Sequence, residues 1–477
     1  MSLILSFLAP PLIGFLLISL LWPSQGPLRS QLVIKSFLAL GLGLGISSCI
    51  FFLWSVAFYP SSAGFATVEA TLLIGLAVIF SYVMRTRGGS ANPPLGPIAN
   101  PRTHWILPAC FYTSLLAAAI AFILSFIRNP HGGWDAWAIW NMRARFIFRG
   151  GDHWTDALSG LLSWSHPDYP LLVPALVARG WVYAGQETVV VPALVSMLFA
   201  LATVGLLSSS VTVLRGKTQG LLAGITLLGT PLFIEQGTSQ LADIPLSFFF
   251  LATIALFCFQ EELAKNKPGF LFLAGMAAGL SAWAKNEGLL FLGSIMLARL
   301  AVRVWVREWK VYLRQMTVFA LGLAPVLTIL LYYKTQLVPP NDLLSALGSE
   351  ASLARLVDLS RYWVVGKAFA VEAAHFGKGF FSGTLLLLVY LLLLGRNDEE
   401  KAAREIVAAL MTLGMLLVGY FFAYIIIPYE LLWSLSTSLS RLFLQLWPSL
   451  LLVFFLAVNT PEQAMRLHPS PDQRSRA

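Results

Sequence analysis

Apolar runs long enough to cross a membrane recur along the whole chain, and short polar segments separate them. A membrane-spanning helix needs about 20 mostly apolar residues, and the runs predict about thirteen such helices. The two shortest are expected at 288–301 and 382–394. The others are expected at 3–22, 35–58, 64–84, 107–127, 187–210, 219–236, 244–260, 269–284, 316–333, 404–427 and 441–458. The predicted fold class is an all-α polytopic membrane protein built as a helical bundle.

Composition agrees with this pattern, because 57% of the 477 residues are hydrophobic and only 12% are charged. Soluble domains are typically about 25% charged. The net charge of +9 comes largely from short loops and does not indicate nucleic-acid binding. The cysteines, all in apolar runs without disulfide or metal-ligand spacing, are interpreted as small core residues: Cys49, Cys110 and Cys258. The first 22 residues lack a basic leader and a clear cleavage site, which favours a retained spanning helix over a signal peptide.

The basic loops predict the orientation of the chain. Alternate loops and the tail carry the positive charge, at Arg29, Arg85, Arg87, Arg102, Arg215, Lys217, Lys265, Lys267, Arg303, Arg307, Lys310, Arg314, Arg396, Lys401, Arg404, Arg466, Arg474 and Arg476. The short loops on the other side, 59–63 and 237–242, carry none. Because positive loops stay in the cytoplasm, we expect the N-terminus outside and the C-terminus inside.

Two long segments, 128–186 and 334–381, fall on the outer side. The first contains a short amphipathic pattern that predicts a helix on the bilayer surface, whose apolar face would be formed by Trp137, Trp140, Ala144, Ile147 and Phe148. A second run, 171–183, is too short for a span and is expected to be an interfacial or re-entrant helix. We expect three parts: N-terminal helices of undetermined role at 1–106, a catalytic domain at 107–458 and a cytoplasmic tail at 459–477.

Five polar motifs are expected at the outer face although they are far apart in sequence. They are WDAW (134–137), SHPDYP (165–170), LADIPL (241–246), AKNEG (284–288) and TSLSRL (437–442). Charge is costly near lipid, and polar groups gathered at one depth are typical of a site in a membrane enzyme.

Each charged candidate has a functional and a structural interpretation. Asp135 can act as a general base or simply cap a helix. Asp243 can likewise be an N-cap. Lys285 can bind phosphate or only pair with Glu287. Arg441 can bind phosphate in a bidentate manner or extend to the membrane surface as a lone charge.

Histidines offer a weaker signal. His166 precedes Pro167 in a turn, where a structural role is as plausible as a ligand contact. A metal site from His131, His153 and His166 is disfavoured, because their spacing matches no familiar ligand set.

Taken in order, the motifs resemble the GT-C superfamily of polyprenyl-phosphate-sugar-dependent glycosyltransferases over residues 107–458. The nearest likeness is to bacterial lipid A aminoarabinose and galacturonic acid transferases, with protein O-mannosyltransferases as more distant relatives. The resemblance implies that Asp135 is the catalytic base of an inverting transfer. It also implies a substrate-binding set of His166, Asp168, Tyr169, Asp243, Lys285, Glu287 and Arg441, with Lys285 and Arg441 facing the lipid phosphate.

Two features depart from the family pattern. Ala136 follows Asp135, so the adjacent Asp-Glu pair typical of protein mannosyltransferases is missing. Three apolar helices also precede the one that normally comes first.

The expected partners are a polyprenyl-phosphate-linked sugar, a lipid, glycan or protein acceptor and the bilayer, but no nucleic acid. No cofactor is expected to be required, and a divalent metal is left open. The expected location is the bacterial inner membrane. The alternatives are a secondary transporter or lipid flippase, a membrane ligase or polymerase of another family, and a scaffolding protein.

Overall fold

The computed structural model describes residues 2–22, 28–58, 62–86, 105–263, 267–341, 345, 349–379, 382–397 and 400–467. Several positions used for the orientation lie outside these ranges: 59–61, Arg87, Arg102, Lys265, Arg474 and Arg476. Parts of the tail and of segment 334–381 lie outside them as well. Throughout the described ranges the secondary structure is helical and contains no β-strand.

Among the described residues ten helices, fewer than the thirteen predicted, are long and apolar enough to cross a membrane. They confirm the predicted class of all-α polytopic membrane protein. They are α1 (Ser2–Leu21), α2 (Leu28–Phe58), α3 (Ser62–Thr86), α4 (Ile106–Arg128), α7 (Val190–Arg215), α10 (Asp243–Leu263), α12 (Glu287–Trp305), α13 (Trp309–Tyr332), α18 (Glu400–Ile426) and α19 (Leu431–Ala457).

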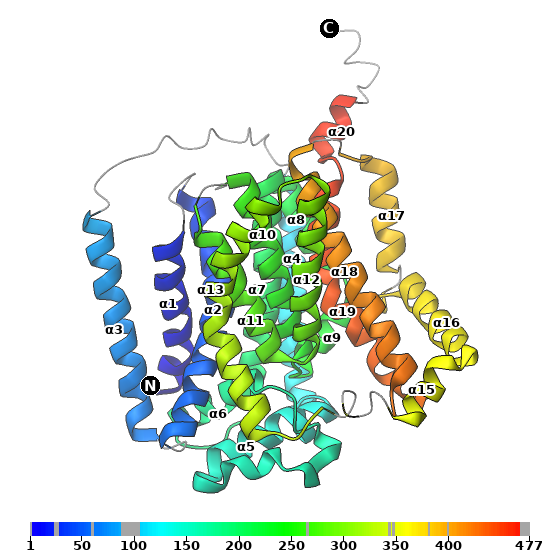
Figure 1. The fold of residues 1–477 in the computed structure, drawn as a ribbon. Helices are drawn as coiled ribbons and strands as arrows, with labels where there is room; N and C mark the ends of the chain where they lie inside the picture. Colours follow the sequence, from blue (N-terminus) through cyan, green and yellow to red (C-terminus); the bar gives the residue numbers. More distant parts are fainter. Residues whose placement is uncertain are drawn as a thin grey trace.

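Shorter helices complete the described fold. They are η1 (Ala136–Trp140), α5 (Asn141–Arg149), η2 (Gly151–Leu158), η3 (Gly160–Ser165), α6 (Leu172–Ala184), α8 (Lys217–Leu228), α9 (Pro231–Thr238), α11 (Gly269–Ala284), η4 (Tyr333–Leu337), α15 (Glu350–Val357), α16 (Leu359–His375), α17 (Gly383–Leu394) and α20 (Pro461–Leu467). The long helices stand side by side, with α5 and α6 below them and α20 above them in Figure 1. We call the lower end the α5–α6 end.

The predicted span 219–236 is broken into α8 and α9. Pro231 begins α9, and a proline inside a continuous helix would clash with the preceding turn. The backbone N–H of Leu232 donates instead to the carbonyl of Gly377, 3.1 Å away. Backbone groups at membrane depth need such a partner, so the break is stabilised by a distant segment.

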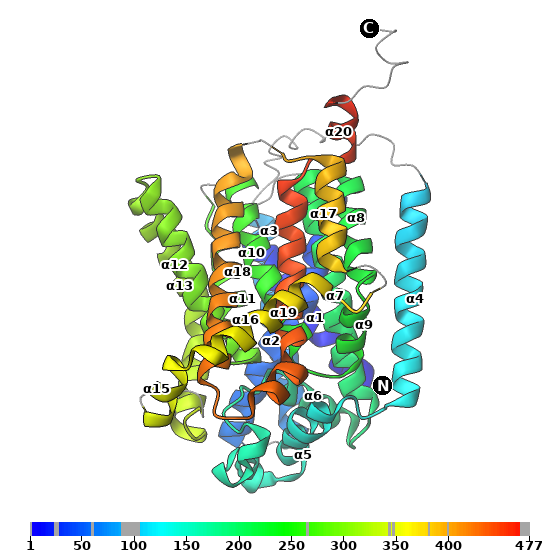
Figure 2. The same cartoon turned by 90° about the vertical axis from the view of Figure 1, so that its right-hand side faces the viewer.

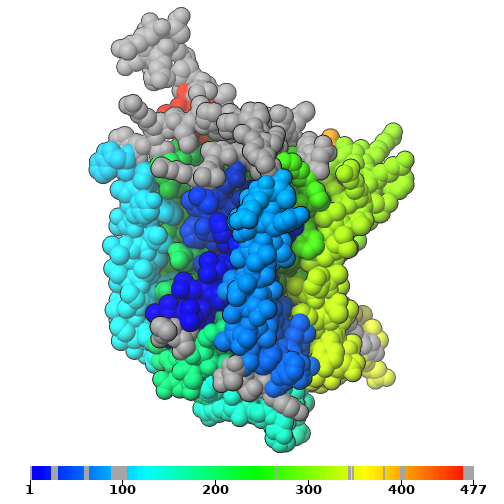
Figure 3. Space-filling view, turned by 90° about the vertical axis from the view of Figure 1, so that its left-hand side faces the viewer, coloured from blue at the N-terminus to red at the C-terminus, as the bar shows by residue number. Residues whose placement is uncertain are grey.

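Helix α10 forms the centre of the bundle, and its most apolar 18-residue stretch is wholly buried. It packs against α7, α11 and α19. Phe248 and Phe249 contact Phe199 of α7 edge to face, while Phe250 stacks on Phe291 of α12 at 4.1 Å. By contrast, only 6% of the residues in the most apolar 18-residue stretch of α3 and of α4 are buried. Both helices stand at the periphery (Figures 2 and 3).

The segment after α4 differs in part from its predicted surface helix. Trp140, Ala144 and Ile147 are buried inside the protein and do not form the predicted face on the bilayer surface, and Trp137 is 54% exposed. Residues 136–140 form a π-helix, whose wider turn rotates Trp137 away from the face that α-helical spacing predicts. The second short helix is present as α6, and nearly all of it is buried against α1, α2, α5 and α7.

Glycines allow α11 and α13 to cross closely. A Cβ atom at Gly275 would lie 1.9 Å from the carbonyl oxygen of Phe319, and one at Gly322 would lie 2.0 Å from that of Phe272. Small residues at helix crossings are a main source of packing between helices in lipid.

Gly275→Ala is therefore expected to lower the stability of the bundle by about 1–3 kcal/mol, because the backbones must move apart. Gly293→Ala on α12, where the added Cβ meets nothing within 4 Å, is the control and should not destabilise it. Thermal unfolding in detergent measures both. Equal melting temperatures would contradict the close crossing.

Candidate active site

Arg441 of α19 joins two carboxylates at the α5–α6 end of the bundle. Its Nη1 lies 2.5 Å from Oδ2 of Asp135, which precedes η1. Its Nε and Nη2 lie 3.1 and 2.8 Å from Oδ2 of Asp243, in the first turn of α10. One guanidinium therefore connects three segments that are far apart in the sequence.

Asp243 is fully buried, and its carboxylate accepts hydrogen bonds from three side chains. Besides Arg441, Nζ of Lys285 lies 3.1 Å and Nε2 of Gln445 lies 2.6 Å from its Oδ1. Gln445 is one turn beyond Arg441 on α19, so both side chains lie on the same face of that helix. Tyr420 of α18 donates to Oε1 of Gln445 at 2.8 Å, which fixes the amide. Asp243 is the buried centre of the site.

Lys285 lies at the sharp junction between α11 and α12. Its backbone is extended, and the chain turns so tightly that a Cβ atom at Gly288 would lie 2.1 Å from the carbonyl oxygen of Ser281. Its Nζ also lies 2.7 Å from Oε1 of Glu287. Burial alone would lower the pKa of Lys285, but Asp243 and Glu287 outweigh it and raise that pKa, so the side chain is an ammonium ion.

The turn at 166–170 forms one side of the site, which we call the wall. His166 adopts a left-handed conformation with φ of 51° and stacks on Tyr169 at 5.0 Å. Tyr169 stacks in turn on Trp140 at 5.7 Å, and the ammonium of Lys285 lies 5.9 Å from its ring. Burial raises the pKa of the Tyr169 phenol, so it stays protonated.

Asp168 ties this turn to the α11–α12 junction. Its Oδ2 accepts from the amides of Asn286 and Asn341, each at 2.7 Å. Lys334 donates to the Asp168 carbonyl at 2.6 Å and to Oδ1 of Asn286 at 2.7 Å. From the other side, Arg143 donates to the carbonyls of Ser165, His166 and Tyr169. The turn is thus held through both its side chain and its backbone.

All eight residues proposed from the sequence belong to this one connected group: Asp135, His166, Asp168, Tyr169, Asp243, Lys285, Glu287 and Arg441. Asp135 has helical dihedrals and makes no side-chain capping bond, so the capping interpretation is wrong. Arg441 is paired twice and is not a lone surface charge. Lys285 does pair with Glu287, but it also reaches Asp243. The catalytic and binding roles stay predictions.

Sequence reasoning missed several partners, namely Arg143, Tyr333, Lys334, Asn341, Tyr420 and Gln445. Gln445 carried a usable signal, because it follows Arg441 at helical spacing. The others come from segments whose approach depends on the whole bundle.

The exposure of the side chains divides the group into a buried part, which we call the floor, and a partly exposed part, which we call the rim. The side chains of Asp243 and Lys285 are 1% and 6% exposed, whereas those of Asp135, Glu287 and Arg441 are 28%, 19% and 17% exposed. Oε2 of Glu287 is itself buried and accepts no hydrogen bond from the described residues. The rim therefore offers an acidic and a basic group to a substrate, above a charged floor that holds them in place.

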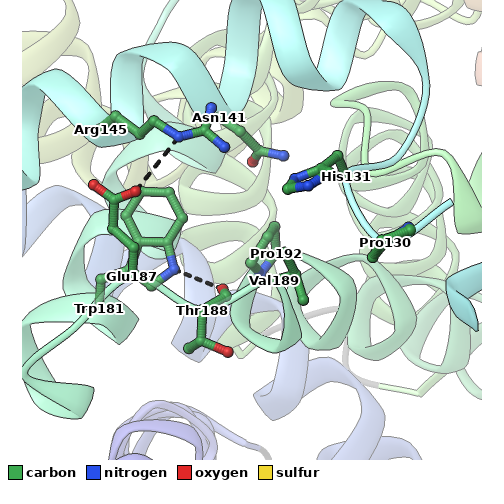
Figure 4. Close-up of a pocket in the computed structure, with 9 residues that line it drawn as sticks. All are labelled: Pro130, His131, Asn141, Arg145, Trp181, Glu187, Thr188, Val189 and Pro192. Atoms are coloured by element: carbon green, nitrogen blue, oxygen red, sulfur yellow. Dashed lines mark hydrogen bonds and ion pairs between the residues drawn. The ribbon is translucent and has the colours of Figure 1, made fainter.

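A separate recess of about 180 Å³ lies between α5, α6 and the start of α7 (Figure 4). It is lined by Pro130, His131, Asn141, Arg145, Trp181, Glu187, Thr188, Val189 and Pro192, and by none of the eight proposed residues. Among the described residues, no group of three or more His, Cys, Asp and Glu side chains is arranged to hold a metal ion.

Residues 166–329 match the family model described as dolichyl-phosphate-mannose-protein mannosyltransferase. Over this segment, about a third of the chain, the sequence is similar to membrane glycosyltransferases of the GT-C type. The matched segment carries the 166–170 turn, Asp243, Lys285 and Glu287, and it begins after Asp135 and ends before Arg441. No curated protein and no solved structure matches the chain.

Asp243→Asn is expected to destabilise the protein by about 3–5 kcal/mol, because it leaves Lys285 and Arg441 without their buried counter-charge. Glu235→Gln removes a carboxylate that is 51% exposed and pairs with Lys378, and it should change stability little. Melting temperatures of the two variants in the same detergent test this. A loss no larger in Asp243→Asn would contradict the central role of Asp243.

Proposed function

We propose that the enzyme transfers a sugar from a polyprenyl-phosphate donor to a hydroxyl acceptor with inversion at the anomeric carbon, using Asp135 as general base. The observation that carries the proposal is the bridge from Arg441 to Asp135 and Asp243. It sets a partly exposed carboxylate beside a partly exposed cation at the end of an apolar bundle. A carboxylate and a cation in that arrangement suit an attacking hydroxyl and a departing phosphate.

Arg441 is the proposed contact for the donor phosphate. Its planar guanidinium has donors on two edges and matches phosphate geometry. Nη1 is the donor nearest the rim, since Nε and Nη2 are bound to the buried Asp243. A phosphate oxygen at Nη1 would compete with Asp135 and so leave its carboxylate free for the acceptor. Lys285, beneath, adds a fixed positive charge to the field at the phosphate.

In the proposed reaction the acceptor oxygen attacks the anomeric carbon from the face opposite the phosphate. The new carbon–oxygen bond forms as the bond to the phosphate oxygen breaks, and its electron pair leaves with the polyprenyl phosphate. The acceptor proton passes to Asp135. Glu287, whose side chain is 19% exposed and pairs with Lys285 through Oε1, is proposed to contact the sugar from the rim.

The same proposal places the α5–α6 end at the outer face of a bacterial inner membrane, with the N-terminus outside and the C-terminus in the cytoplasm. Its support is the distribution of basic loops, which concentrate at the opposite ends of the helices. The donor would enter sideways from the outer leaflet with its tail in hydrocarbon. The acceptor is a hydroxyl of a lipid, glycan or protein.

Asp135→Asn keeps the side-chain shape but removes the base, so transfer should slow by about 10²–10⁴-fold. The donor is first identified by mass spectrometry of lipids that co-purify with the protein, and release of polyprenyl phosphate then gives the rate. Asp152→Asn, on the same segment with a side chain 72% exposed, is the matched control and should retain the wild-type rate. Full activity in Asp135→Asn at normal expression would sink the assignment.

The orientation is tested with one added cysteine at a time in a Cys110→Ser background, where the remaining Cys49 and Cys258 are buried. Leu161→Cys, at a position 92% exposed in segment 128–186, should react with an impermeant maleimide added outside intact cells. Lys310→Cys, in the first turn of α13, should react only after permeabilisation. The reverse labelling pattern would refute the proposed topology.

A further inference from the structure

The helix that follows the 166–170 turn is anchored to α3 by a buried ion pair and to α1 by a hydrogen bond of the same guanidinium. Arg179 of α6 contacts Glu69 of α3 through Nε at 3.0 Å and Nη2 at 2.5 Å. Its Nη1 donates to the carbonyl of Ser6 in α1 at 2.6 Å, and Tyr183 donates to Glu69 at 2.6 Å. The Arg179 and Glu69 side chains are 2% and 1% exposed. One guanidinium therefore joins α1, α3 and α6.

Helix α2 makes a second connection, this time to both sides of the site. The hydroxyl of Ser48 donates to the carbonyl of Leu172, 3.0 Å away at the start of α6. The same oxygen accepts from Nε1 of Trp283, also at 3.0 Å. Leu172 is two residues after the 166–170 turn, and Trp283 is two residues before Lys285. A single hydroxyl thus sets the separation of the wall and the floor.

Phe52, one turn further along α2, packs among the rings behind the site. Its ring centroid lies 5.0 Å from that of Trp283 and 6.0 Å from that of Tyr333. Tyr333 donates to the carbonyls of Pro167 and Tyr169 at 3.0 and 2.7 Å. The contacts of α2 therefore reach the turn by a second route.

We propose that α1–α3 serve as a positioning unit for sugar transfer, in which Ser48 and Arg179 hold the 166–170 turn against Lys285. These helices precede the matched segment 166–329. Ser48 and Arg179 are positioning residues because they act through Leu172, Trp283 and α6 and touch none of the eight site residues. The catalytic consequence rests on the proposed function, whereas the placement of the turn does not.

The choice of residues argues for positioning rather than adhesion alone. Burying a charged pair costs more than packing apolar side chains of similar volume, so apolar contacts would join these helices at lower cost. A two-donor guanidinium–carboxylate contact fixes both distance and direction, which apolar contact does not. Such fixed geometry matters where a shift of about 1 Å costs up to about 10²-fold in rate.

Ser48→Ala tests the inference against Ser55→Ala. Ser55 is buried two turns further along α2, and its hydroxyl donates to the Phe51 carbonyl of its own helix. In Ser48→Ala we expect faster backbone hydrogen exchange confined to 166–172, together with a fall in kcat of about 10–100-fold at nearly constant donor KM. Ser55→Ala should match wild type in both measurements, and Ser48→Thr, which restores the hydroxyl, should recover the rate.

Glu69→Gln provides the second test, with the exposed Glu235→Gln as its control. The weakened pair should again speed exchange at 166–172 and lower kcat, with the protein still monodisperse in size-exclusion chromatography. Exchange at the turn that stays at the wild-type level in both Ser48→Ala and Glu69→Gln would overturn the inference. Faster exchange at the turn, combined with no sugar transfer by the wild-type protein, would support the placement and defeat the proposed function instead.

Discussion

The buried carboxylate of Asp243 is the constraint on which the rest of the site depends. An ion this deep in an apolar bundle is costly unless cations and hydrogen bonds compensate it. Here the compensation comes from Lys285, Arg441 and Gln445, which belong to the α11–α12 junction and to α19. Those elements must therefore meet α10 at one depth. Arg441 also donates to Asp135, so the compensation of Asp243 places the segment after α4 against the end of the bundle.

Hydropathy was enough to predict the helical bundle, because each long span satisfies its own backbone hydrogen bonds and presents an apolar surface to lipid. The gathering of the polar motifs followed from alternating the spans across the membrane. Which polar residues pair with one another could not be predicted from the order of the spans. Glu69 and Arg179 are 110 positions apart, and nothing local to either residue shows that α3 and α6 meet. Trp137 was assigned to the wrong face because the π-helical turn is a local departure from the usual period.

The family match and the geometry support different parts of the molecule. Segment 166–329 contributes the turn, Asp243 and Lys285, which form the wall and floor. Asp135 and Arg441 come from before and after it, and they form the rim where the proposed chemistry takes place. The part of the site that resembles a known family is thus the wall and the floor. The residues that would decide the reaction are joined to it through Arg441 and rest on geometry alone.

A second group of ion pairs lies at the opposite end of α12 and explains how this helix is kept from sliding along its neighbours. Arg299 and Arg303 are each more than nine-tenths buried and both contact Glu405 of α18, while Arg303 also contacts Glu261 and Glu308. Helix α12 is therefore held by charges at both ends, since Lys285, two residues before its start, pairs with Asp243 of α10. A helix in lipid can slide along apolar neighbours at modest cost, but here a slide would separate buried ions at two depths. That restraint keeps the cations and carboxylates of the rim and floor in fixed positions, and electrostatic stabilisation of a departing phosphate requires such preorganisation.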